Sequence, residues 1–223
     1  MSRVGVMIPT YNRPDFLRAS VAQWCMQTVR PDVICVHQNG NPESYEWCVE
    51  DMKDLCEIKW LHTPVQIPQH LWYLVPLEYL LADGCDYFFW GDHDDMYMRR
   101  HVEECLSELR GTDFTIANSC GVLFTKKDAY KYNKPARFTA HAPGGMSSSM
   151  AFNRQFATML SADIKQDLLI NKKYYYTDNV VAFETMPKFR LCSSPRLTTV
   201  YMSHEGSTSS FHWAESELAD KQQ

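Results

Sequence analysis

The densest group of acidic side chains in the sequence is Asp92-His93-Asp94-Asp95, directly after the aromatic run Tyr87–Trp90. Three carboxylates within four residues repel one another unless a hard cation neutralises them. In an open α/β sheet, ligands bind beyond the carboxyl ends of the strands. If Tyr87–Trp90 is a strand, the cluster lies at such an end. This position favours a divalent metal site over the alternative of a solvated acidic turn.

A second candidate site is the segment Ile8–Pro14, with the sequence Ile-Pro-Thr-Tyr-Asn-Arg-Pro. A strand stopped by Pro9 and followed by small, aromatic and basic side chains suits a loop that stacks on a base and faces phosphate. A helix that begins at Pro14 would point the positive end of its dipole at an anion. The segment is also a good turn, so on its own it leaves both interpretations open.

Short apolar runs alternate with helical patterns in the first half of the chain. The expected strands are Arg3–Ile8, Val33–His37, Ile58–His62 and Tyr87–Trp90. One expected helix begins at Pro14. Three others cover Glu43–Leu55, Gln69–Ala82 (with a kink or broken start at Pro76) and Arg99–Leu109. This alternation predicts an α/β fold with a mostly parallel central sheet flanked by helices.

The second half shows a different pattern, with more strands and polar loops. The expected elements are a strand pair at Phe114–Ala117 and Gly121–Thr125, strands at Ser149–Phe152, Phe189–Cys192 and Leu197–Met202, and helices at Asn153–Leu160, Asp178–Thr185 (capped by Thr177) and Trp213–Lys221. We therefore expect a small antiparallel strand pair beside the central sheet.

Composition narrows the class of protein. Of the 223 residues, 45% are hydrophobic, and the net charge of -5 argues against a general affinity for nucleic acid or anionic lipid. None of the eight cysteines forms a Cys-x-x-Cys pair, which argues against zinc and favours buried free thiols over a disulfide framework. The sequence shows neither a signal peptide nor a transmembrane segment, so a cytoplasmic protein is expected.

The two motifs together resemble glycosyltransferase family 2, the inverting enzymes of the GT-A fold. Val4–Pro14 is similar to the family's first strand and nucleotide loop, and Val33–Gly40 to its second strand and base-recognition turn. Tyr87–Asp95 is similar to the strand that leads into the family's Asp-x-Asp motif. The resemblance implies one GT-A (Rossmann-like) domain over residues 1–223, with a nucleotide-sugar half at 1–110, an acceptor half at 111–210 and a C-terminal helix or tail at 211–223.

The resemblance also implies an activity. It is the metal-dependent transfer, with inversion, of a hexosyl or deoxyhexosyl group from a nucleotide-diphosphate sugar to an acceptor hydroxyl on a glycan, glycolipid or glycoprotein. The donor is expected to be a UDP-sugar and the metal Mn²⁺ or Mg²⁺, and polysaccharide biosynthesis is the expected role. Asn39 stands where the family has a base-reading aspartate, and the Gln66–Leu81 region lacks the family's Arg-Asn pair. The choice of nucleotide therefore stays open.

Individual residues receive roles from the same resemblance. The donor-side residues are Pro9, Thr10, Tyr11, Arg13, Asn39, Asp92 and His93. Thr10 and Tyr11 would line the nucleoside pocket, and Asp92 would face the ribose and the donor sugar. Asp94 would bind the metal, with His204 as a candidate second ligand, and His93 is expected to be a spacer rather than a ligand.

The catalytic base is expected in the segment Tyr176–Asn179, where the family has a carboxylate at a helix start. By that match Asp178 takes the proton of the acceptor hydroxyl. The acceptor side is expected to include Gly145, Met146 and Tyr176. Two simpler interpretations remain: Asp178 as an acidic residue favoured by a helix dipole, and His204 as an ordinary loop histidine.

Three other functions stay open from the sequence. A sugar-nucleotide pyrophosphorylase or other nucleotidyltransferase would share the α/β layout but usually opens with a glycine-rich loop, and Ile8–Pro14 contains no glycine. The second function is a non-catalytic nucleotide-sugar or glycan-binding module of a larger multidomain glycosylation enzyme. The third is a retaining transferase on the same fold.

Overall fold

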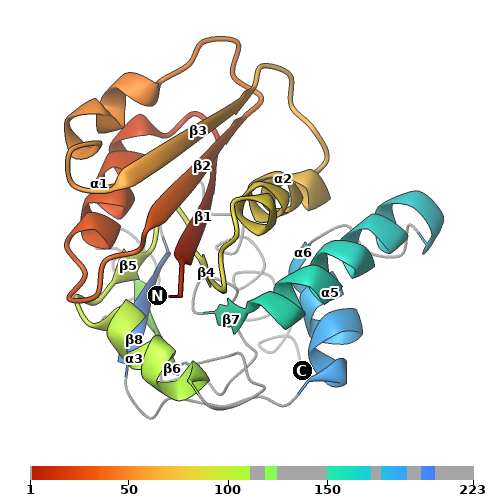
Figure 1. Ribbon diagram of the computed structural model, residues 1–223. Coiled ribbons are helices and arrows are strands. Elements are labelled where there is room, and N and C mark those ends of the chain that lie inside the picture. Colours follow the sequence, from red (N-terminus) through yellow and green to blue (C-terminus); the bar gives the residue numbers. More distant parts are fainter. Residues whose placement is uncertain (1, 111–118, 125–149, 172–176, 190–196, 204–223) are drawn as a thin grey trace, which may run out of the picture.

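The computed structural model describes residues 2–110, 119–124, 150–171, 177–189 and 197–203 (Figure 1). Its central sheet has the strand order β3-β2-β1-β4-β7. The strands are β1 (Val4–Thr10), β2 (Val33–Asn39), β3 (Glu57–Thr63), β4 (Tyr87–Trp90) and β7 (Ala151–Asn153). The first four are parallel, and β7 is antiparallel to β4. The predicted α/β fold with a mostly parallel sheet is confirmed.

Helices cover both faces of this sheet. One face carries α1 (Pro14–Cys25), the 3-10 helix η1 (Glu46–Met52) and α3 (His101–Leu109). The other carries α2 (Gln69–Ala82), α5 (Arg154–Gln166), α6 (Thr177–Val180) and η4 (Val181–Thr185). Two short turns, η3 (Asp167–Asn171) and η5 (Met186–Lys188), follow α5 and η4. Among the described residues, no helix has the length and apolar character needed to cross a membrane.

A second, smaller sheet has the order β5-β8-β6, formed by β5 (Met96–Tyr97), β8 (Leu197–Ser203) and β6 (Ser119–Phe124). The small antiparallel pair is therefore present, but it joins β5 to β8. β6, which covers most of the expected strand Gly121–Thr125, runs parallel to β8 instead. Its expected partner, Phe114–Ala117, lies outside the described residues. No local pattern marks β5, because a two-residue strand forms only where a distant strand supplies its partner.

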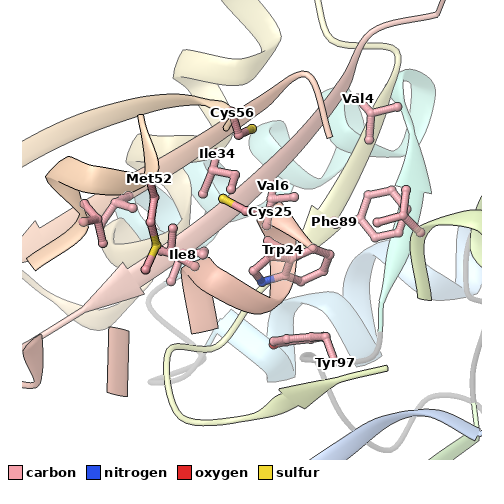
Figure 2. Packing of buried hydrophobic residues seen from close by; sticks show 14 of the residues in the cluster. Val4, Val6, Ile8, Trp24, Cys25, Ile34, Met52, Cys56, Phe89 and Tyr97 are labelled. Atoms are coloured by element: carbon pink, nitrogen blue, oxygen red, sulfur yellow. The ribbon is translucent and has the colours of Figure 1, made fainter. Parts of the chain in front are cut away.

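The strands of the sheet centre are buried on both faces, as parallel strands between two helical layers must be. Side chains alternate between the two layers: Val6 and Ile8 join the cluster under α1, and Met7 joins the cluster under α2. Figure 2 shows the first cluster, in which the Trp24 ring lies 5.9 Å from that of Phe89 between ring centroids. This packing fixes α1, and with it the loop that precedes α1.

β1 does not stop at Pro9 as expected but continues to Thr10, with Pro9 aligned to His37. The pairing of β1 with β4 ends at Met7, whose carbonyl accepts a hydrogen bond from Gly91 N at 2.9 Å. Pro9 lies two residues further on, so its backbone faces the same side, beyond the end of the ladder. The missing N–H of proline therefore removes no sheet hydrogen bond.

Pro76 lies inside α2, and the helix runs without a break from Gln69 to Ala82. Because proline lacks an N–H, the carbonyl of Trp72 four residues earlier loses its helical donor. His37 Nδ1 on β2 lies 2.9 Å from this carbonyl and replaces the lost donor. The expected broken start is therefore wrong. The helix is joined to β2 at the Trp72 carbonyl, where Pro76 removes a helical hydrogen bond.

Other expected elements differ at their ends or lie outside the described part. The helix expected over Glu43–Leu55 is the shorter η1, and the one expected over Asp178–Thr185 is divided into α6 and η4. Thr177 is the first residue of α6, and its buried hydroxyl has no hydrogen-bond partner among the described residues, so the expected cap is not seen. Phe189 is a bend, while 190–192 and the helix expected at Trp213–Lys221 lie outside the described residues.

Candidate functional site

The strand order of the central sheet reverses between β1 and β4. From β1 the chain builds outward through β2 and β3, and then returns to place β4 on the other side of β1. Loops that leave two such neighbouring strands diverge and open a crevice, where ligands of open α/β sheets bind. The loop after β1 contains Tyr11–Arg13, and the loop after β4 contains Asp92–Asp95. Both motifs singled out from the sequence therefore lie at this switch point.

Two contacts join these loops directly. His93 Nδ1 lies 3.1 Å from the carbonyl oxygen of Pro9. Arg13 donates a hydrogen bond from its guanidinium to Asp94 Oδ2 at 2.9 Å. The Arg13 guanidinium also lies over the ring of Phe16, 5.8 Å from its centroid. Since Arg13 immediately precedes α1, the acidic loop is tied to the start of that helix.

Asp92 is held by side chains from three different elements. Its carboxylate accepts a short hydrogen bond from the Tyr73 hydroxyl on α2. Its N–H donates to the Tyr97 hydroxyl on β5 at 2.6 Å, and its carbonyl accepts from Ser20 Oγ on α1 at 3.1 Å. Burial, with the nearby charges of Asp95 and Asp92, raises the pKa of Tyr97 well above its ordinary value. Tyr97 is therefore a neutral hydroxyl here, and Asp92 has a fixed orientation.

The loop after β1 is supported by Tyr45, which sequence reasoning did not identify. Thr10 is buried, and its Oγ1 lies 3.0 Å from the Tyr45 hydroxyl. Tyr11 is 41% exposed, so its ring is open to a ligand. Between this ring and α1, Asn12 adopts the left-handed conformation with φ 49°. Of the two residues expected to line the nucleoside pocket, Tyr11 presents its side chain to solvent and Thr10 supports the loop from below.

Asn39 ends β2 and is fully buried. Its Oδ1 accepts a hydrogen bond from Ile67 N at 2.9 Å, while its Nδ2 has no hydrogen-bond partner among the described residues. Gly40 follows with φ +81°, and a Cβ there would lie 2.8 Å from Cβ of Gln66. Glycine is therefore required where the two loops touch. The amide Nδ2 of Asn39 is enclosed with the rest of the side chain, so Asn39 supports these loops and does not face solvent.

A metal is predicted at this place, while the described residues contain no group of three or more His, Cys, Asp or Glu side chains arranged around one metal position. The predicted ligand His204 lies outside them. The chemistry of Asp94 nevertheless fits a cation, because its carboxylate already binds the positively charged guanidinium of Arg13. Asp95 is buried beside Tyr97 and lies deeper than Asp94.

The predicted base lies on an element near this site. Asp178 belongs to α6, which contacts α2 and α5. Val180 of the same helix is buried in one apolar cluster with Tyr73 and Trp90, the residues around Asp92. The structure does not describe the side chain of Asp178. The acceptor-side candidates Gly145, Met146 and Tyr176 lie outside the described residues.

Two supporting residues could have been found only in part from the sequence. Tyr97 follows the acidic cluster by two positions, which hints that it accompanies the loop. Tyr73 sits in an apolar helix pattern and looks like core, and its ring does pack, tilted by 35°, against that of Trp90, with the centroids 4.0 Å apart. Only the packing of α2 across the end of β4 brings its hydroxyl to Asp92.

Comparison with known proteins gives structural matches alone: no family model and no curated protein matches the sequence. The fold is similar to S. aureus TarS 1-349 in complex with UDP, with a TM-score of 0.64 and 10% identity over 90% of this chain and 60% of that chain. The complex of TarS 1-349 with UDP-GlcNAc matches with a TM-score of 0.64 and 12% identity, over 93% of this chain and 60% of that one.

A mannosyltransferase, PcManGT from Pyrobaculum calidifontis in complex with GDP-Man and Mn²⁺, matches with a TM-score of 0.60 and 13% identity, over 94% of this chain and 59% of that one. At these identities the likeness establishes the fold: the chain has the GT-A, Rossmann-like fold of these glycosyltransferases. It spans about 60% of the length of the TarS 1-349 chain.

Proposed function

We propose that this protein is a glycosyltransferase that moves a sugar from a nucleotide-diphosphate donor to an acceptor hydroxyl with inversion. The observation that carries the proposal is the meeting of two loops at the switch point of the sheet, through His93 to Pro9 and Arg13 to Asp94. The nucleotide-sugar complexes of TarS and PcManGT, which share the fold, support it. The acceptor is proposed to be a glycan, glycolipid or glycoprotein.

The donor would lie across the loops after β1, β2 and β4. Tyr11 offers an exposed ring on which a base can stack. Asn39 is buried and would support the base pocket by holding the loop at Ile67. A UDP-sugar is the proposed donor, because the matched TarS structures hold UDP and UDP-GlcNAc. Asp92, oriented by Tyr73, would accept hydrogen bonds from the ribose and the sugar.

The diphosphate would lie between Arg13 and Asp94. Both side chains are partly exposed, 26% and 20% respectively, so both can meet a ligand. Asp94 would hold a divalent cation, Mn²⁺ or Mg²⁺, which stabilises the charge that builds on the leaving diphosphate. Asp178 would take the proton from the acceptor hydroxyl as its oxygen forms the new bond to the anomeric carbon and the bond from that carbon to the diphosphate breaks. General-base help of this kind accelerates a reaction by roughly 10²- to 10⁴-fold.

The proposal is tested by incubating the protein with a panel of UDP-, GDP- and TDP-sugars and Mn²⁺, and measuring the released nucleotide. Release of a nucleoside diphosphate from one donor, by transfer or slow hydrolysis, supports a glycosyltransferase. Pyrophosphate release from a nucleoside triphosphate and a sugar phosphate would identify a nucleotidyltransferase instead. Donor binding in a thermal-shift assay without any turnover would indicate a binding module, and retained anomeric configuration in the product would replace inversion by retention.

A further inference from the structure

We infer that His93 is a metal ligand, binding through Nε2 the same divalent cation as Asp94. This gives His93 a role beyond that of a spacer between two aspartates. The inference rests on the proposed function for the presence of a cation beside the diphosphate. It comes from the positions of the two imidazole nitrogens relative to Pro9 and Asp94.

The hydrogen bond to Pro9 determines which nitrogen of His93 can bind a metal. A carbonyl oxygen can only accept, so Nδ1, at 3.1 Å from it, carries the hydrogen. In the neutral imidazole the lone pair then resides on Nε2. Metal-binding histidines almost always donate their other ring N–H to a carbonyl or carboxylate in this way, which fixes the ring and raises its basicity.

Pro9 is well suited to this task. It lies beyond the last residue pair of β1 with β4, so none of the described strands uses its carbonyl on that side. Its backbone is part of the buried strand β1 and is held in register with His37 on β2. The imidazole is therefore oriented by the rigid centre of the sheet, and its side chain is 17% exposed.

The second nitrogen lies on the side of Asp94. His93 Nε2 is 3.9 Å from Asp94 Oδ2. Bonds of about 2.1 Å at octahedral or tetrahedral angles place two ligand atoms on one ion roughly 3.0 to 3.5 Å apart. The observed separation is slightly wider than this, so Asp94 would move toward the ion while His93 keeps its bond to Pro9. An ion there would need oxygen ligands from the diphosphate and water, as Mg²⁺ and Mn²⁺ in nucleotide sites commonly have.

Arg13 indicates that this position accepts positive charge. Its guanidinium contacts the same Oδ2 of Asp94 at 2.9 Å. A cation bound by His93 and Asp94 would share this oxygen with Arg13 or displace it toward the diphosphate. A nitrogen ligand also favours Mn²⁺ over Mg²⁺, because Mg²⁺ prefers oxygen.

The alternative role of His93 is purely structural, as a link from the acidic loop to Pro9. His93→Asn separates the two roles, because the asparagine amide can replace Nδ1 as the donor to Pro9 but offers no atom at the place of Nε2. The matched control is His62→Asn, since His62 Nε2 contacts the carbonyl of Asn41 on an exposed loop. His204→Ala removes the other candidate nitrogen ligand.

The test measures Mn²⁺ binding by calorimetry, with and without UDP, and ¹⁴N coupling to bound Mn²⁺ by pulsed electron paramagnetic resonance. We expect the wild type and His62→Asn to show ¹⁴N coupling that remains in His204→Ala. His93→Asn should lose that coupling and bind Mn²⁺ at least about tenfold more weakly, with an unchanged melting temperature.

Coupling or Mn²⁺ affinity that survives in His93→Asn would overturn the inference, and so would a wild type that takes up no Mn²⁺. These results are separable from failure of the proposed function. A ¹⁴N coupling lost in His93→Asn, in a protein that turns over no nucleotide-sugar, would leave the metal ligand in place and remove the transferase activity.

Discussion

The candidate site has two regions that are held together in different ways. At the ends of β1 and β4, the contact between loops is a charged pair, Arg13 with Asp94, whose side chains are partly exposed. At the end of β2, the contacts are neutral hydrogen bonds made by buried side chains. Asn39 accepts one from Ile67 N–H, and His37 bonds to the Trp72 carbonyl and the Thr63 hydroxyl. Charged groups near solvent can exchange one partner for another at little cost, whereas buried neutral hydrogen bonds are costly to leave unmade.

This difference assigns the two regions different tasks. Under the proposed function, the charged region is the part that a diphosphate or cation would enter by replacing existing charge contacts. The neutral region would set the shape of the base pocket and would not need to rearrange. Ligand binding should therefore depend most on the charged region, and folding stability most on the neutral one.

The largest effect is expected from Asp178→Asn, which alters neither region. Without the carboxylate no general base accepts the proton, so the rate of transfer should fall by roughly 10²- to 10⁴-fold. Donor affinity, measured by calorimetry with Mn²⁺, should stay the same. A variant that transfers sugar at the normal rate would remove Asp178 from the mechanism.

The next effect is expected from Asp94→Asn in the charged region. Loss of the proposed metal ligand should weaken Mn²⁺-dependent donor binding by at least about tenfold. The free energy of unfolding should change by less than about 1 kcal/mol, because partly exposed ion pairs contribute little. Calorimetry and urea unfolding measure the two quantities. Asp51→Asn, which breaks the exposed pair with Arg18, is the control and should leave donor binding intact.

Lowering the pH should destabilise the folded protein through its buried neutral histidines. Burial lowers the pKa of His37, and burial lowers that of His101 to about 3. The unfolded chain therefore binds more protons than the folded one, and stability is lost as the pH falls below the unfolded value of about 6.5. For His101 the loss continues to about pH 3.

The expected loss is up to about 1.4 kcal/mol per pH unit for each histidine. His37→Gln should reduce this slope in urea unfolding between pH 7 and pH 5. An equal slope in His37→Gln and in the wild type would show that His37 is not a neutral link in the folded protein.

The smallest effect is expected from Tyr45→Phe, which removes the hydroxyl contact to Thr10. The loss should be about 1 kcal/mol in the free energy of unfolding, the net value of one hydrogen bond. Donor affinity should change less than in Asp94→Asn. A loss of donor binding as large as that of Asp94→Asn would mean that the Tyr45 hydroxyl itself contacts the donor.

The sequence determined much of the first half, because local signals there agree with the fold. Aromatic and β-branched runs identified β1 to β4, Pro14 marked the start of α1, and Gln69–Ala82 was predicted with the observed bounds. The order of these elements requires crossovers that bring the carboxyl ends of parallel strands to one edge. The two motifs could therefore be placed near each other before any coordinates.

Tertiary structure alone decided how these motifs are held. Strand β5, the parallel pairing of β6 with β8, and the contacts of Tyr73, Tyr97 and Tyr45 join segments far apart in the sequence. Pattern reasoning reads periodicity along one segment, and it does not report which hydroxyl on one helix reaches a carboxylate on a distant loop. A pattern names the residue types at a site, and only the packing of side chains decides what they touch.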